Sequence, residues 1–309
     1  MPRFDIVSLG EPMVEFNQTR GDDPHAYRQG FGGDTSNMAI AAARLGARVA
    51  YVTRVGDDAF GRQFRELWRA EGVALDGVAT DPDAPTGLYF VTHGPSGHAF
   101  SYMRAGSAAS RMAPATLPLD LIRAAGALHV SGISQAISGS ACDTVFAAIE
   151  AATTAGARVS YDPNLRLKLW SLPRARAVIR ATAALCQWFL PSLDDVRTLS
   201  GQTDPRAIVD WCHALGAPVV VLKCGREGVI VSDSRREERL AGHVVDTVDA
   251  TGAGDCFDGA FAARTVEGDD LFAAARYANA AAALATTGFG AVAPLPRDAD
   301  VRALLERAA

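Results

Sequence analysis

The sequence predicts an α/β protein with a three-layer α/β/α architecture. Helices cover both faces of a mainly parallel sheet, and a small β-sheet forms a lid. Short apolar runs alternate with amphipathic helical patterns along most of the 309 residues, which is typical of parallel sheets. Hydrophobic residues make up 49% of the chain, enough for a large core. Two segments depart from the alternation, and we assign them to the lid.

Strand and helix signals follow one another from the N-terminus. Phe4–Leu9 is a short apolar run that ends at a glycine, which predicts a buried strand. The later elements are expected to be a helix over 37–45, a strand over 48–52, a helix over 60–71, a strand over 128–130, a helix over 142–155, and strands over 159–161, 188–190 and 219–222. Ligands of such sheets bind beyond the carboxyl ends of the strands.

Residues 11–31 and 86–104 do not fit a strand–helix unit. The second segment alternates on both sides of a turn at 94–97, which predicts a β-hairpin. The first segment has turn residues between short alternating stretches, namely Pro12, Gly21, Pro24 and Gly30. We expect both segments to form one small sheet over the strand ends, as the lid of a single domain spanning 1–309.

Composition excludes several classes of function. The net charge is −5 and the pI about 5.7, so the chain has no basic field for nucleic acid or an anionic membrane. The five cysteines are scattered without the spacing of a zinc site or a disulfide framework. The N-terminus has no apolar signal core, and no run is long enough to span a membrane. These features favour a cytoplasmic enzyme.

The most informative stretch is 246–261. Gly252 and Gly254 flank Ala253, and Asp255 follows at once, before apolar residues at helical spacing. A small-residue turn therefore opens a helix whose free N–H groups attract anions. A carboxylate at that point can take a proton from a hydroxyl while the amides of residues 252–254 hold a phosphoryl group. This arrangement indicates a small-molecule kinase with Asp255 as general base.

Other interpretations of this stretch were weighed. An aspartate in the first turn of a helix is often only a capping residue. A dinucleotide-binding fingerprint needs a small residue where Phe257 stands, and the P-loop pattern is absent from the chain. A nicotinamide oxidoreductase is therefore disfavoured.

A second glycine-rich motif, 31–37, precedes the first predicted helix. Its paired glycines permit unusual backbone conformations and the close approach of a ligand. The same pattern also fits a tight turn in which Asp34 or Ser36 caps the helix. A third turn, 56–61, is interpreted as having a structural role.

Together these segments resemble the ribokinase family of PfkB-type carbohydrate kinases over essentially the whole chain. The N-terminal signature is similar to Gly32-Gly33 followed by Asn37, with Gly56-Asp57 behind it and the next glycine displaced to Gly61. The C-terminal signature is similar to 249–255. Within the family the chain most resembles 2-keto-3-deoxygluconate kinases, through four stretches: 10–16, 32–37, 102–110 and 162–170.

The resemblance implies a site for a sugar acid. Arg104 and Arg166 are expected to bind its carboxylate, because arginine gives directional, charge-assisted hydrogen bonds to such a group. The alternative is that both arginines form surface ion pairs of little energetic value. The remaining sugar-binding residues implied by the resemblance are Gly33, Asn37, Tyr89 and Tyr102, beside Asp255.

The resemblance also implies an ATP site in the loop after the strand at 219–222. Lys223 is expected near a phosphate, although it also reads as a surface charge at a strand end. Asn279 is expected near the adenine or ribose, unless it has a local helix partner. The full set of nucleotide-binding residues is Ser192, Lys223, Gly225, Arg226, Gly228 and Asn279.

Many family members carry Asn-x-x-Glu where this chain has Ser192 and Asp195. We expect Asp195 to help hold Mg²⁺, most of whose coordination comes from ATP and water. Some relatives bind a monovalent cation near the positions of Asp249 and Thr251.

The sequence thus predicts ATP-dependent phosphorylation of the terminal hydroxyl of 2-keto-3-deoxygluconate. The alternatives are a fructokinase or other neutral-sugar kinase of the same family, and a non-catalytic sugar sensor. We also expect a homo-oligomer, because the exposed edge of the lid sheet invites pairing between subunits.

Overall fold

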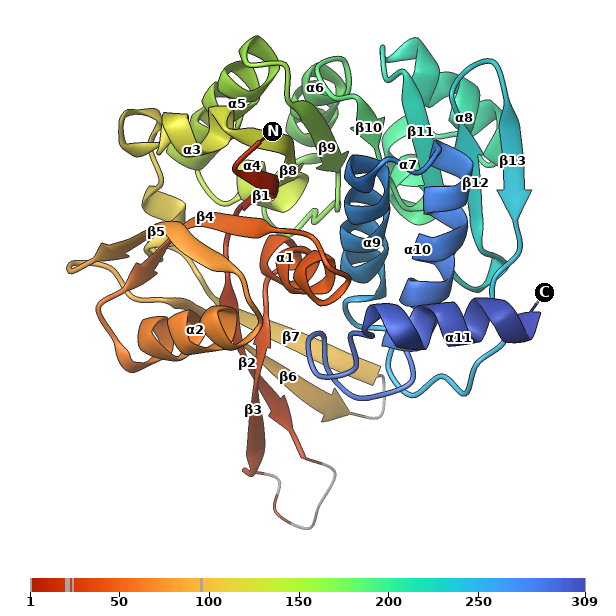
Figure 1. Cartoon of the computed structure of the whole chain (residues 1–309). Coiled ribbons are helices and arrows are strands. Elements are labelled where there is room, and N and C mark those ends of the chain that lie inside the picture. The colour runs from red at the N-terminus through yellow and green to blue at the C-terminus, as the bar shows by residue number, and fades with distance from the viewer. Residues whose placement is uncertain (1, 20–22, 24, 95–96, 309) are drawn as a thin grey trace.

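The computed structural model describes residues 2–19, 23, 25–94 and 97–308. Its main sheet has nine strands in the order β13-β12-β11-β10-β9-β8-β1-β4-β5 (Figure 1). The strands from β5 to β11 are parallel, and β12 and β13 extend the sheet as an antiparallel pair. Their bounds are β1 Phe4–Leu9, β4 Val49–Gly56, β5 Ala74–Asp81, β8 Ala125–Ser131, β9 Arg158–Asp162, β10 Trp188–Phe189, β11 Val219–Lys223, β12 Val229–Ser232 and β13 Glu237–Leu240.

Helices cover both faces of this sheet, because successive side chains of a strand point to opposite sides. On β1, Ile6 belongs to one buried cluster and the adjacent Val7 to the other. The Ile6 face packs against α1 Asp34–Arg44, α2 Ala59–Ala70, α9 Ala253–Glu267, α10 Leu271–Ala285 and α11 Asp298–Ala308. The Val7 face packs against α3 Leu119–Arg123, α5 Gly139–Thr154, α6 Leu172–Ala183, α7 Leu193–Ser200 and α8 Pro205–Ala214. The predicted three-layer arrangement is confirmed.

Most elements predicted from sequence lie close to their observed positions. The first strand has the predicted bounds. The helix predicted at 37–45 begins three residues earlier, at Asp34, and the strand predicted at 48–52 extends to Gly56. The strand predicted at 188–190 contains only two residues. None of the helices in the described part of the chain has the length and apolar character that a bilayer crossing requires.

The lid is a separate four-stranded sheet in the order β3-β2-β6-β7. Its strands are β2 Met13–Gln18, β3 Tyr27–Gly32, β6 Gly87–Gly94 and β7 Gly97–Met103. The predicted hairpin is confirmed as the antiparallel pair β6–β7, while β2 joins β6 in parallel. Within the two lid segments, residues 20–22, 24, 95 and 96 lie outside the described residues. They include Gly21, Pro24 and the centre of the predicted turn.

The turn at 56–61 ties the lid to the main sheet. The Asp58 carboxylate accepts hydrogen bonds from the Gly61 amide at 2.7 Å, which caps α2. It also accepts from the Thr86 amide at 2.7 Å and the Thr86 hydroxyl at 2.9 Å, directly before β6. The structural interpretation of this turn therefore has a clear physical basis.

The motif at 31–37 differs from one sequence expectation. Neither Asp34 nor Ser36 caps α1; the N-cap is Gly33, with φ of 105° and no side-chain cap. A Cβ on Gly33 would lie 2.4 Å from the carbonyl oxygen of Glu11. The glycine is thus needed for close approach of the two backbones, which sets the start of α1 against the end of β1.

Candidate active site

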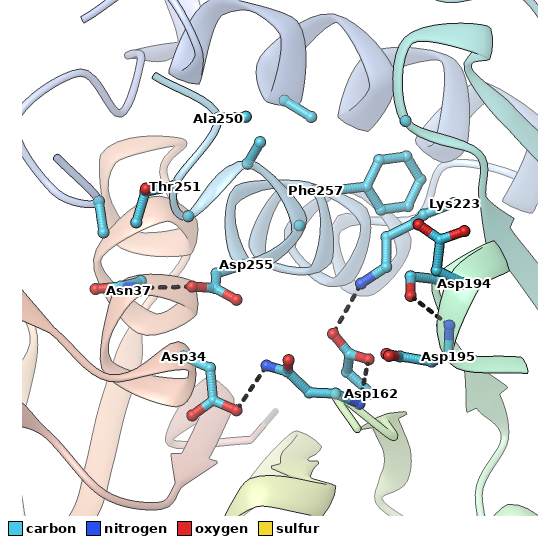
Figure 2. A pocket seen from close by; sticks show the side chains of 18 of the residues that line it. Asp34, Asn37, Asp162, Asp194, Asp195, Lys223, Ala250, Thr251, Asp255 and Phe257 are labelled. Carbon is cyan, nitrogen blue, oxygen red and sulfur yellow. Dashed lines mark hydrogen bonds and ion pairs between the residues drawn. The ribbon is translucent and has the colours of Figure 1, made fainter. Parts of the chain in front are cut away.

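A cavity of about 1200 Å³ lies beyond the carboxyl ends of the parallel strands, between the lid and the first turn of α9 (Figure 2). This is where open parallel sheets bind their ligands. All the site residues expected from the sequence line this cavity. They are Gly33, Asn37, Tyr89, Tyr102, Arg104, Arg166, Ser192, Asp195, Lys223, Gly225, Arg226, Gly228, Gly252, Ala253, Gly254, Asp255 and Asn279.

The start of α9 has the predicted geometry. Gly252 is the N-cap in the left-handed conformation, with φ of 79°, and a Cβ there would lie within 3.0 Å of Ala291. Among the described residues, no acceptor bonds the amides of Gly252 and Gly254. The Ala253 amide, however, donates to the Ala250 carbonyl at 3.2 Å. The N–H of Ala253 thus closes the preceding turn, and its expected contribution to the anion hole stays a prediction.

Asp255 lies in the first turn of α9 and points into the cavity (Figure 2). Asn37 of α1 donates to its carboxylate through Nδ2, at 2.8 Å. Burial, together with the nearby charges of Asp34 and Asp162, raises the pKa of Asp255 to about 7, although Asn37 and Lys223 act in the opposite direction. A carboxyl that titrates near neutrality is suited to general base catalysis.

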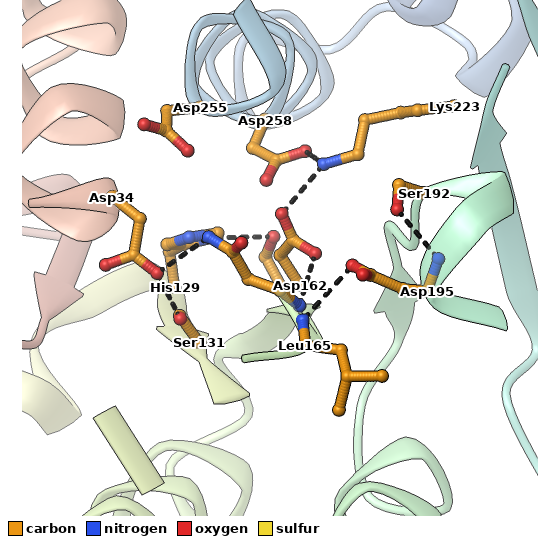
Figure 3. A network of polar contacts seen from close by, with 12 residues as sticks. Asp34, His129, Ser131, Asp162, Leu165, Ser192, Asp195, Lys223, Asp255 and Asp258 are labelled. Atoms are coloured by element: carbon orange, nitrogen blue, oxygen red, sulfur yellow. Dashed lines mark hydrogen bonds and ion pairs between the residues drawn. The ribbon is translucent and has the colours of Figure 1, made fainter. Parts of the chain in front are cut away.

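The floor of the cavity is a network of acids at the strand ends (Figure 3). Asp34 accepts hydrogen bonds from the Ser131 hydroxyl and from Asn164 Nδ2, the latter at 3.0 Å. Burial raises the pKa of Asp34 as well. The Asp162 carboxylate, at the end of β9, accepts from the Asn164 amide at 3.0 Å. These contacts fix the side chains that surround Asp255.

Lys223 ends β11 and lies between two carboxylates. Its ammonium donates to Asp162 Oδ2 at 2.9 Å and to Asp258 Oδ1 at 2.8 Å. Only 12% of the side chain is exposed. The interpretation of Lys223 as a surface charge is therefore wrong, while its expected contact with a phosphate stays a prediction.

Asp195 and Ser192 lie at the start of α7. The Ser192 hydroxyl caps this helix by accepting the Asp195 amide at 3.2 Å, and Asp195 Oδ2 accepts the Leu165 amide at 3.2 Å. Burial raises the pKa of Asp195 to about 6. The described residues include no group of three metal-ligating side chains. A single carboxylate fits a magnesium ion that takes its other oxygens from phosphates and water.

At the lid end, Arg104 follows β7 and forms a buried ion pair with Glu11, which follows β1. The Ser107 hydroxyl also donates to Glu11, at 2.7 Å. Arg104 is 8% exposed, and its Nε has no partner among the described residues. Arg104 is thus not a surface pair. Its Nε donor is buried within the protein, and its charge is balanced by Glu11.

Arg166 differs from Arg104 because its side chain is exposed on the cavity wall. It donates to the carbonyl of Leu165 at 2.9 Å, and within the described part of the chain no carboxylate forms an ion pair with it. Its charge opposes the rise in the pKa values of Asp34 and Asp195, and its exposed side chain leaves the guanidinium accessible to a ligand.

The two tyrosines of the lid differ in what they offer a ligand. The hydroxyl of Tyr89 donates to Glu15 at 2.6 Å, so its proton is held within the lid and its ring is the part left for a ligand. Tyr102 is 38% exposed, and its ring lies 5.8 Å from that of Tyr89 and 5.7 Å from the Arg104 guanidinium.

The residues expected to contact ATP have less distinctive surroundings than those around Asp255. Gly225 and Gly228 have positive φ, and a Cβ on Gly228 would lie 2.0 Å from the Leu240 carbonyl, so this glycine serves backbone packing. Arg226 is exposed. Asn279 donates to the Ala241 carbonyl at 2.7 Å, which is a distant partner in sequence and not a local one. Their contacts with ATP stay predictions.

At the expected monovalent-cation site, the Asp249 carboxylate already accepts hydrogen bonds from the protein. Asp249 accepts hydrogen bonds from the amide and hydroxyl of Thr251, at 2.9 and 2.7 Å, and from the Gly290 amide at 3.0 Å. These bonds order the loop before α9. Binding of a monovalent cation stays a prediction.

Several acids in and around the cavity received no chemical role from the sequence, among them Glu11, Asp34, Asp162 and Asp258. Glu11 and Asp162 directly follow or end apolar runs, so their position at the carboxyl end of a strand was a usable signal. Asp34 stands in the glycine-rich motif. Asp258 lies inside a helical pattern, where only the fold shows that it faces Lys223.

Comparison with known proteins agrees with this geometry. Residues 3–298 match the pfkB family of carbohydrate kinases. The chain is 35% identical to fructokinase-2 of Solanum habrochaites, over 97% of this chain and 96% of that one. It is 36% identical to 2-dehydro-3-deoxygluconokinase of Thermoproteus tenax, over 96% and 93%.

A solved structure gives the same result. Fructokinase from Vibrio cholerae O395, bound to fructose, ADP and calcium, superposes with a TM-score of 0.87 at 29% identity, over 97% of this chain and 98% of that one. Both the fold and the sequence match therefore extend over nearly the whole chain. The protein belongs to the PfkB family of carbohydrate kinases, with a ribokinase-like fold.

Proposed function

We propose that this carbohydrate kinase transfers the γ-phosphoryl group of ATP to the terminal hydroxyl of 2-keto-3-deoxygluconate. One observation carries the choice of a sugar acid: Arg166 presents to the same cavity as Asp255 a guanidinium that forms no ion pair within the described residues. A neutral sugar offers no charge to pair with it, whereas the carboxylate of a sugar acid does. The relatives named 2-dehydro-3-deoxygluconokinase support the same choice.

In this proposal Asp255 accepts the proton of the sugar hydroxyl as the hydroxyl oxygen attacks phosphorus. The amides of Gly252 and Gly254 face the phosphoryl group and stabilise its charge, aided by the helix dipole. Asn37 orients the carboxylate by its hydrogen bond to Asp255. Positioning and charge stabilisation supply most of the acceleration in phosphoryl transfer.

The sugar acid lies under the lid. Arg166 and Arg104 would bind its carboxylate, and the rings of Tyr102 and Tyr89 would cover its carbon chain. Gly33 leaves room at the start of α1. Closure of the lid sheet would exclude water and so suppress hydrolysis of ATP.

ATP occupies the end of the cavity around α7, β11 and α10. Ser192, Lys223, Gly225, Arg226, Gly228 and Asn279 would contact the nucleotide, and Asp195 would face its magnesium ion. When bound, magnesium neutralises charge on the phosphate oxygens. The single carboxylate of Asp195 suits such a shared ion.

A second candidate is a fructokinase, and two observations favour it. A fructokinase relative is as similar to the chain as the sugar-acid kinases are, and Glu11 balances the charge of Arg104. A non-catalytic sugar sensor would not need a carboxyl whose pKa is raised to about 7 at the first turn of α9. This observation therefore disfavours the sensor.

The test is a coupled ADP-release assay over 2-keto-3-deoxygluconate, 2-keto-3-deoxygalactonate, fructose, ribose and gluconate. We expect the highest kcat/KM for a 2-keto-3-deoxy sugar acid. A higher value for fructose would replace the proposal by the fructokinase alternative. Absence of sugar-dependent ADP release across the panel would favour the sensor.

We also propose a homo-oligomer that pairs through the lid. The strands β3 and β7 are the edges of that sheet, and unpaired strand edges readily accept another strand. Light scattering coupled to gel filtration measures the molar mass; a monomer at micromolar concentration would contradict this.

A further inference from the structure

Lys223 connects three elements that the chain keeps far apart. It ends β11, its ammonium bonds Asp162 at the end of β9, and a second bond reaches Asp258 inside α9. Figure 3 shows the ammonium between the two carboxylates. The contact with Asp162 therefore fixes the ammonium on the sheet, and the contact with Asp258 fixes the helix on the ammonium.

Asp258 lies one turn after Asp255 on α9, so the two side chains move as one rigid unit with the helix. Asp258 is 1% exposed, which leaves it no water to replace the lysine. The ammonium also lies close to the anion-binding turn, since a Cβ on Gly254 would be 3.7 Å from Lys223 Nζ. A shift of the lysine would thus displace the first turn of α9.

Most of the bonding capacity of the ammonium is already used. A lysine ammonium has three N–H donors, and two of them are held by Asp162 and Asp258. This leaves one donor for a phosphate, whereas a lysine that serves mainly as a phosphate contact would keep its donors turned to the ligand. The geometry therefore favours a role toward the helix over a role toward ATP.

We propose that Lys223 is a positioning residue which, held by Asp162, fixes α9 through Asp258 and so places Asp255 and the Gly252–Gly254 amides for phosphoryl transfer. The proposal rests on the proposed role of Asp255 as general base. It does not depend on which sugar is phosphorylated.

The experiment compares Lys223→Met, Asp258→Leu and Asp258→Asn with the wild type. Both Lys223→Met and Asp258→Leu remove the tie to the helix, so both should lower kcat by roughly 10- to 100-fold, as expected for a misplaced reacting group. In the two Asp258 variants, which keep the lysine and its proposed contact with the nucleotide, the KM for ATP should stay within about twofold. Asp258→Asn keeps an oxygen acceptor of the same shape and should recover most of the kcat that Asp258→Leu loses.

A matched control separates positioning from loss of stability. Arg264 forms a partly buried ion pair with Asp269 at the other end of α9. Arg264→Met should lower the thermal unfolding midpoint and leave kcat per folded enzyme unchanged. If Lys223→Met does not fold, the two Asp258 variants still decide the question.

Two results would overturn the proposal. One is a wild-type kcat in Asp258→Leu beside an impaired Lys223→Met; the other is a Lys223→Met defect confined to the KM for ATP, which would identify a phosphate contact. Failure of the base assignment has a different signature, since it would show as wild-type turnover in Asp255→Asn.

Discussion

The two ends of the cavity differ in how their polar groups are satisfied. At the helix end, Asp162, Lys223 and Asp258 are nearly inaccessible and bond one another, and Asn37 holds Asp255. At the lid end, Arg166 and Tyr102 are exposed. The groups proposed to act on phosphorus are thus organised before any ligand arrives, while those proposed to recognise the sugar are left open to it. Rigid organisation suits the common reaction, and exposure suits a family that varies its substrate.

Asp255→Asn is the change that should disrupt the helix end most. The amide cannot accept the proton, so kcat should fall by roughly 100-fold or more, while the unfolding midpoint and ATP binding are retained. A steady-state assay of ADP release measures the loss of kcat. Glu267→Gln, at an exposed position on the same helix, is the control. Turnover at the wild-type rate would remove Asp255 from the role of base.

The two arginines allow a comparison within the lid end. Arg104→Ala and Arg166→Ala should each raise the KM for the sugar acid by roughly 10- to 100-fold and leave that for ATP unchanged. Only Arg104→Ala should also destabilise the fold, by about 3–5 kcal/mol, because it leaves the buried Glu11 without its partner.

Denaturant titration measures the stability of both variants. The double variant Glu11→Gln/Arg104→Met should recover part of the stability without recovering the KM. Equal stability losses in Arg104→Ala and Arg166→Ala would contradict the difference in their surroundings.

Changing pH should move activity and stability in opposite directions. The pKa of Asp255 is raised to about 7 and that of Asp195 to about 6, so the folded protein binds protons that the unfolded chain has already lost. Stability therefore falls as pH rises from about 5 to about 8. Over the same interval kcat should rise, because the base must be ionised, with its midpoint near pH 7.

Differential scanning fluorimetry and rate measurements in one buffer series test this. Asp255→Asn should make the stability curve less steep. A kcat that is flat down to pH 5 would show that the base ionises well below the expected range.

The smallest effect is expected at Tyr102. Its ring packs near Arg104 and Tyr89, and its hydroxyl carries no assigned role. Tyr102→Phe should leave the KM for sugar nearly unchanged, whereas Tyr102→Ala should raise it by roughly two- to tenfold. If Tyr102→Phe alone raises the KM that far, the hydroxyl and not the ring contacts the sugar.

Local signals predicted the parts of the structure that depend on neighbouring residues. The apolar run from Phe4 to Leu9 gave the first strand its bounds, and the glycines before Asp255 gave the start of α9. Pairing between distant segments had no such signal. The parallel join of β2 to β6 places Glu15 opposite Tyr89, and this register is what removes the tyrosine hydroxyl from the predicted sugar site.

The same limit explains the acids that the sequence left without a role. A carboxylate at the end of a strand can be placed at the right edge of the sheet, as Asp162 could have been. Its partner cannot be named until the strand order is known, because β10 separates β9 from β11. The Asp162–Lys223 contact spans that strand, so it exists only in the folded sheet.

Asp58, which bonds both the start of α2 and Thr86, restricts how the lid can move. Three hydrogen bonds on one carboxylate fix the chain just before β6, and a fourth bond links the Thr86 hydroxyl to the Gly56 amide at 3.0 Å. Any swing of the lid over bound sugar must therefore pivot beyond Thr86. The turn at 56–61 would then be the fixed point of that proposed movement, although it does not line the cavity.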